Sequence, residues 1–84
     1  MQKFHVGDVV KLNNKKLVRH ERHKQLFPGL TGVVREVHCS GAEYVWYEVQ
    51  WDSPSKVLRS GWWVFESNLD FAEPPPSINI KVLL

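Results

Sequence analysis

The stretch "YVWYEVQWD", residues Tyr44 to Asp52, is the clearest strand signal in the chain and decides its fold class. One face of the expected strand carries Tyr47, Val49 and Trp51, and the other carries Trp46, Glu48 and Gln50. This alternation is typical of a strand with one face in a core and the other outside it. Asp52 to Ser55 then have turn chemistry, and Pro54 could not continue a central strand.

Shorter strand patterns flank this stretch on both sides. "VGDVVKL" (Val6 to Leu12) places Val10 and Leu12 on one face, and "TGVVREVH" (Thr31 to His38) starts at Gly32, which suggests a bulge or a close backbone approach. "GWWVFE" (Gly61 to Glu66) is followed by one helical turn, "SNL", and a last short strand, "DFA". The order predicts an all-β fold: a small SH3-like barrel of about five strands with a long first loop, over residues 1–73.

The remaining residues, 74–84, form a separate element. Pro74, Pro75 and Pro76 predict a stiff polyproline spacer. The tail "SINIKVLL" (Ser77 to Leu84) is strand-like and apolar, so it needs a partner edge in its own barrel or in a neighbouring chain.

Length and charge limit the classes of function. Eighty-four residues make one domain with a small core, so oligomerisation or docking onto a protein partner is expected. The chain has no apolar run of 18 residues and no signal peptide, which predicts a cytoplasmic protein without membrane contact. The net charge is +2, but residues 1–24 hold seven Lys and Arg against two acids, whereas residues 25–84 hold four against seven. This asymmetry can direct docking between protein surfaces or attract phosphate.

The histidines raise the question of a metal site. His20 and His23 are three residues apart, and His5 and His38 could converge on them. Zinc normally takes three or four ligands, often thiolates, and Cys39 is the single cysteine of the chain. We therefore predict neither a metal nor a cofactor.

Nucleic-acid binding is a further alternative, because basic residues gather in the first loop. Lys15, Lys16 and Lys24 could contact phosphates, together with the loop arginines and an exposed tryptophan. Glu21 interrupts the basic run, however, and further acids lie on the neighbouring strands. This reading is less favoured than protein binding.

The sequence carries no recognisable catalytic motif, such as GxSxG or a P-loop. Cys39 and His38 are neighbours on a strand and point to opposite faces, so they form no dyad. Glu66 is expected to cap or anchor the helical turn that follows it. The chain is predicted not to be an enzyme by itself.

The four tryptophans predict an interface. Trp46 lies opposite in face to Trp51, and Trp62 opposite to Trp63, so at least two of them must lie outside the core. We expect these rings and the basic first loop to form a partner-binding surface. Its predicted residues are Arg19, His20, Arg22, Trp46, Trp62 and Trp63.

The order of motifs resembles a known family. "FHVGDVVKL", "HER", a glycine ten residues after that arginine, "YEVQWD" and "FESNLDF" resemble the SH3-like barrel of the nitrile hydratase beta subunit and of thiocyanate hydrolase. The resemblance covers Phe4 to Phe71. It implies that Arg22 reaches the metal centre of a Cys-rich alpha subunit and that His20 orients the loop. A guanidinium can bind oxidised thiolates or another anion bidentately.

The chain also departs from that family. Its second basic residue is replaced in the segment Phe27 to Gly29, the loop between the second and third strands is shortened, and the helical N-terminal domain is absent. The chain carries no metal-binding cysteine motif. It could therefore act only as an accessory or beta-like subunit of such an enzyme, not as a nitrile hydratase alone.

Overall fold

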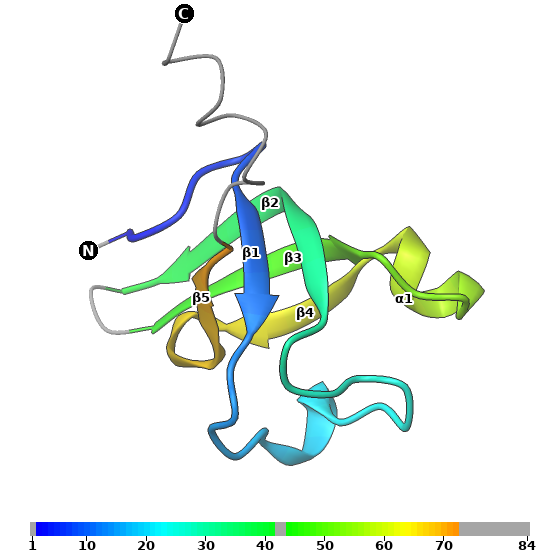
Figure 1. Cartoon of the computed structure of the whole chain (residues 1–84). Helices are drawn as coiled ribbons and strands as arrows, with labels where there is room; N and C mark the ends of the chain where they lie inside the picture. Colours follow the sequence, from blue (N-terminus) through cyan, green and yellow to red (C-terminus); the bar gives the residue numbers. More distant parts are fainter. Residues whose placement is uncertain (1, 42–43, 73–84) are drawn as a thin grey trace, which may run out of the picture.

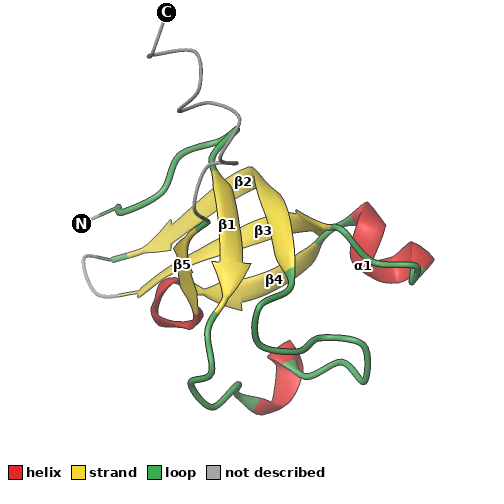
Figure 2. Cartoon of the chain, viewed as in Figure 1, coloured by secondary structure: helices red, strands yellow, loops and turns green. Residues whose placement is uncertain are grey.

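The computed structural model describes residues 2–41 and 44–72, which form one five-stranded antiparallel sheet (Figures 1 and 2). The strands are β1 (Val9–Leu12), β2 (Thr31–Ser40), β3 (Tyr44–Trp51), β4 (Trp62–Phe65) and β5 (Leu69–Phe71), and their order in the sheet is β4-β3-β2-β1-β5. Three short helices lie between strands: η1 (Arg19–Glu21), α1 (Lys56–Ser60) and η2 (Glu66–Asn68). The predicted all-β class is confirmed. Among the described residues β4 and β5 form no ladder with each other, so closure into an SH3-like barrel stays a prediction.

The core lies on the inner face of the sheet. Tyr47, Val49 and Trp51 of β3 are buried, as their alternation predicts, and they pack with Val10 of β1 and Val64 of β4. Figure 1 shows β1 and β5 crossing in front of β3 and β4. The inner side chains of these two pairs of strands therefore meet in the middle of the molecule.

Gly32 marks the expected close backbone approach. A Cβ atom at this position would lie 2.6 Å from Cγ1 of Val49 and 2.7 Å from the backbone oxygen of Gln50. Only glycine allows β2 and β3 to approach this closely here.

A bulge at Arg35 changes which side of the sheet the following side chains of β2 point to. Val34 pairs with Val49 and Glu36 pairs with Glu48, so Arg35 is an extra residue in the ladder. Val34 points into the core, whereas His38, four residues later, pairs with Trp46 on the outer side. Without the bulge, residues 34 and 38 would share one face.

Several boundaries differ from those predicted. β1 starts at Val9 rather than Val6, because Gly7 adopts a φ of 96° in a turn closed by a hydrogen bond from Asp8 N to His5 O. β2 continues to Ser40 rather than ending at His38, since Ser40 pairs with Tyr44. η2 and β5 each begin one residue earlier than the expected turn and strand.

Helix α1 was not predicted. Ser55 caps it by accepting a hydrogen bond from Leu58 N, and Gly61 ends it with a φ of 124°. Leu58 is fully buried, so a single apolar side chain anchors this short helix to the core.

The first loop and the C-terminal residues were the other predicted elements. The long first loop is present and contains one helical turn, η1. The proline spacer and the strand-like tail, residues 74–84, lie outside the described residues. In the described part of the chain, no helix is long and apolar enough to cross a membrane.

Candidate functional site: an aromatic face on β3 and β4

The outer side of β3 and β4 carries large aromatic side chains. Trp46 pairs with Phe65 across the two strands, and Trp63 pairs with Glu48. Because side chains alternate along a strand, these residues point away from the core that their neighbours Tyr47 and Val64 enter. Trp46, Trp63 and Phe65 are each half-buried.

Two histidines join these rings into one continuous surface. The ring centroid of His20, in η1, lies 5.7 Å from that of Phe65, which lies 5.8 Å from Trp46. The bulge brings His38 to 4.5 Å from Trp46 and 6.1 Å from Trp63. We call these five residues (His20, His38, Trp46, Trp63 and Phe65) the aromatic face.

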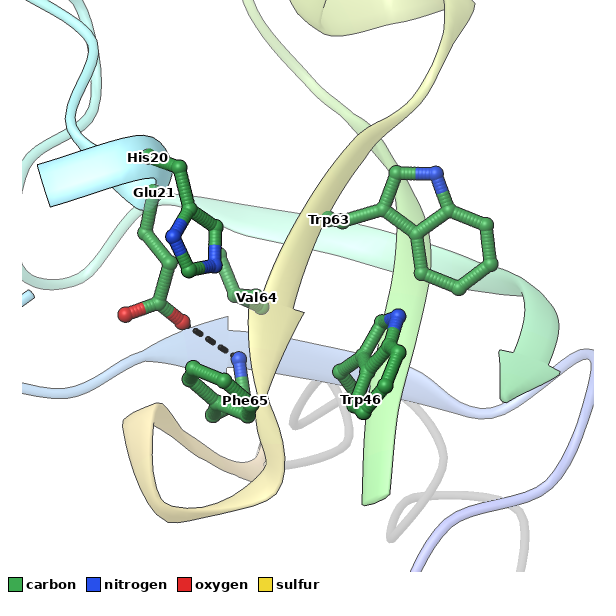
Figure 3. Close-up of a pocket in the computed structure, with 6 residues that line it drawn as sticks. All are labelled: His20, Glu21, Trp46, Trp63, Val64 and Phe65. Atoms are coloured by element: carbon green, nitrogen blue, oxygen red, sulfur yellow. Dashed lines mark hydrogen bonds between the residues drawn. The ribbon is translucent and has the colours of Figure 1, made fainter. Parts of the chain in front are cut away.

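A surface hollow of about 470 Å³ lies on the aromatic face. Figure 3 shows the two tryptophan rings on one side of β4 and His20 with Glu21 on the other. Its lining residues are His20, Glu21, Trp46, Trp63, Val64 and Phe65. The indole N–H groups of Trp46 and Trp63 donate no hydrogen bond to any described residue, so both can donate to a ligand. Two further hollows, of about 430 and 530 Å³, have a smaller share of aromatic residues in their linings.

Glu21 fixes the first loop against the edge strand β4. Its carboxylate is fully buried and accepts hydrogen bonds from Phe65 N, from Asn68 Nδ2 at 2.9 and 3.0 Å, and from Val18 N at 2.8 Å (Figure 3). Its backbone oxygen accepts a hydrogen bond from the indole of Trp62 at 2.8 Å. These bonds hold the neighbouring His20 beside Phe65. In the sequence Glu21 was only an interruption of a basic run, so its role was missed.

Glu66 anchors the N-terminal segment rather than its own helical turn. Its Oε2 accepts hydrogen bonds from the hydroxyl of Tyr47 at 2.6 Å and from Lys3 N at 2.9 Å, and the hydroxyl in turn accepts from Phe4 N at 3.1 Å. The structure shows no side-chain cap on η2, so the expected cap role is wrong. Burial, followed by the hydrogen bond to Glu66, raises the pKa of Tyr47 to about 12.

This shift predicts a loss of stability at high pH. In the unfolded chain Tyr47 ionises near its ordinary pKa of 10.0, whereas in the folded chain it stays protonated up to about 12. The stability that depends on a protonated Tyr47 is therefore complete below pH 10 and is lost between pH 10 and 12. Over this range the free energy of unfolding should fall by about 2–3 kcal/mol. Urea titrations at successive pH values should show a shallower fall for Tyr47→Phe than for the exposed control Tyr44→Phe. Equal slopes in the two variants would contradict this assignment.

The structure brings together only part of the predicted partner-binding set. His20, Trp46 and Trp63 lie on the aromatic face. Trp62 instead pairs with Val49, packs against the core and contacts the ring of His23 at 5.1 Å. Arg22 lines a separate hollow with Leu17, His23, Lys24 and Leu26, and Arg19 is exposed in η1. Phe65 and His38 belong to the face but were not predicted.

The residues considered for phosphate and metal binding are distributed over the surface. Lys15 lines the hollow beside Glu66, Lys24 lines the hollow with Arg22, and Lys16 is exposed. His20 and His23 contact different rings. Within residues 2–41 and 44–72, no group of three or more His, Cys, Asp or Glu side chains is placed to hold a metal ion.

Comparison of the chain with protein-family models, with curated proteins and with solved structures finds no match. The resemblance to the nitrile hydratase beta subunit therefore stays a prediction.

Proposed function

We propose that this protein is a non-catalytic association module that binds a second copy of itself through the aromatic face. The observation that carries the proposal is the chain of contacts that links the five rings, four of which line one hollow, with two indole N–H groups that have no acceptor among the described residues. Partly exposed aromatic side chains that gather on one surface of a small protein often mark an interaction site. Tryptophan is also one of the residues enriched among those that dominate binding energy.

The rigidity of the surface supports the same proposal. Trp46 and Trp63 lie on paired strands, and Glu21 fixes the loop that carries His20. A surface that is already ordered loses little conformational entropy when it binds. Association would also add stability to the small core of this 84-residue chain.

The double variant Trp46→Ala/Trp63→Ala tests the proposal. Removing two central interface aromatics should cost at least about 2 kcal/mol, which raises the dissociation constant of the self-associated form by about thirtyfold or more. Sedimentation equilibrium at a series of protein concentrations measures this constant. Circular dichroism should show that the variant remains folded, because both side chains lie outside the core.

Phe27→Ala is the matched control for this test. Phe27 is an exposed aromatic residue of the first loop and does not line the hollow. Its replacement should leave the dissociation constant unchanged. If the folded double variant associates as tightly as the wild type, the aromatic face is not the association surface.

Arg22 favours a second candidate, a beta-like subunit of a nitrile hydratase-type enzyme. Its side chain is exposed and donates only through Nε, to Leu17 O at 3.3 Å, so the other guanidinium nitrogens make no hydrogen bond with the described residues. Such a group can bind an anionic centre of another chain. A gene next to the one for this chain should then encode a Cys-rich metal-binding subunit. The absence of such a gene from the genomic neighbourhood would contradict this candidate.

A further inference from the structure

The chemistry of the hollow indicates which kind of ligand fits it. Most of its lining is aromatic, and it offers two hydrogen-bond donors, the indoles of Trp46 and Trp63. The carboxylate of Glu21 is already occupied by Phe65 N, Val18 N and the Asn68 amide. The hollow therefore suits a neutral ligand with flat apolar surfaces and carbonyl acceptors, rather than a cation that needs a free carboxylate.

The chain itself contains a segment with these properties. The last described residue is Ala72, and only Glu73 separates it from Pro74, Pro75 and Pro76. Consecutive prolines favour the polyproline II conformation, which has no internal hydrogen bonds and leaves its carbonyl groups free to accept them. One turn of this helix rises about 9 Å. It can therefore span neighbouring rings such as Phe65 and Trp46, whose centroids are 5.8 Å apart.

The position of β5 favours the hollow of another molecule. Ala72 N donates a hydrogen bond to Val9 O of β1, and β1 and β5 face the inner side of β3 and β4 (Figure 1). The hollow lies on the outer side of β3 and β4. Packed layers of strands are about 10 Å apart, whereas Glu73 and Pro74 extend the chain by at most about 7 Å. To reach the hollow of its own molecule, a segment that starts after Ala72 would have to cross from the inner to the outer side of the sheet within a few residues, whereas the segment of a second copy has no such constraint.

We infer that the segment from Glu73 to Pro76 of one molecule docks in the aromatic hollow of a second copy. This inference rests on the proposed self-association and names its contact. The prolyl rings would pack on Trp46, Trp63 and Phe65, with indole N–H groups donating to the proline carbonyls. Glu73 would approach the exposed Arg19 beside His20, in keeping with the excess of basic residues near the start of the chain. Reciprocal docking of two tails gives a symmetric dimer.

The first experiment compares two full-length tail variants. Replacing Pro74, Pro75 and Pro76 together by alanine should raise the dissociation constant by about tenfold or more, because the segment loses its preformed conformation and its rings. The control Ile78→Ser/Ile80→Ser changes the strand-like part of the tail and should have a smaller effect. If the proline variant associates like the wild type while Trp46→Ala/Trp63→Ala does not, the inference fails and the proposed function stands. A stronger effect of the isoleucine changes would instead assign the contact to the strand-like part.

A mixing experiment tests whether the contact is made between molecules. The proline variant keeps an intact aromatic face, and Trp46→Ala/Trp63→Ala keeps an intact tail. Each alone should be monomeric at a concentration where their mixture forms a dimer joined by one tail contact. A mixture that stays monomeric would overturn docking between copies.

Discussion

Glu21→Ala should lower the free energy of unfolding by about 3–5 kcal/mol, the largest effect expected for any single replacement of a charged residue in this chain. The change leaves Phe65 N, Val18 N and the amide of Asn68 without their buried acceptor. A domain of this size has a total stability of only about 4–13 kcal/mol. The variant should therefore be close to unfolding at physiological temperature.

Glu21→Gln keeps the side-chain volume but removes the charge and one acceptor oxygen, so it measures how much these two properties contribute to stability. Each carboxylate oxygen of Glu21 faces two donors, so the amide NH2 group of glutamine must oppose donors in either orientation. We expect a loss of about 2 kcal/mol. Chemical denaturation measures both variants against Glu36→Ala, an exposed acid on β2 that should change stability by less than about 0.5 kcal/mol. A Glu21→Ala variant as stable as the Glu36→Ala control would show that the carboxylate does not hold the loop to β4.

Trp62→Ala should mainly lower the stability of the fold and Trp63→Ala should mainly weaken self-association, although the residues are neighbours. Trp62 packs against the core and donates its indole N–H to Glu21 O. Its loss should cost about 3 kcal/mol of stability, somewhat below the upper range for a fully buried tryptophan. Trp63 lies on the aromatic face, and its loss should cost no more than about 1 kcal/mol.

The two variants can be compared in one pair of measurements. Denaturant titration should show a large shift of the unfolding midpoint for Trp62→Ala and a small shift for Trp63→Ala. Sedimentation should show weaker self-association for folded Trp63→Ala. Similar midpoints for both variants would contradict the assignment of Trp62 to the structural side of β4.

The alternation of residues along β3 predicted much of this architecture. Tyr47, Val49 and Trp51 identify the inner face without further information, and the parity of the tryptophans separates Trp46 from Trp51 and Trp62 from Trp63. Parity alone does not say which member of the second pair is inside. That choice depends on the register between β3 and β4, which pairs Trp62 with the buried Val49.

Other features depend on contacts between distant segments. The bulge at Arg35 moves His38 to the side of Trp46, and a bulge of this kind leaves no mark in the alternation of a short strand. Glu21 lies in a basic loop, and its partners Phe65 and Asn68 are more than 40 residues away. Phe65 could have been found, because it shares the parity of Trp63 on β4.

The mass of the wild-type chain in solution, measured by sedimentation equilibrium from low to high protein concentration, tests the central proposal most directly. Association through the aromatic face predicts a dimer that dissociates to a monomer on dilution, and the dimer should be lost in Trp46→Ala/Trp63→Ala. A wild-type chain that keeps the mass of one monomer at every concentration would contradict the proposal.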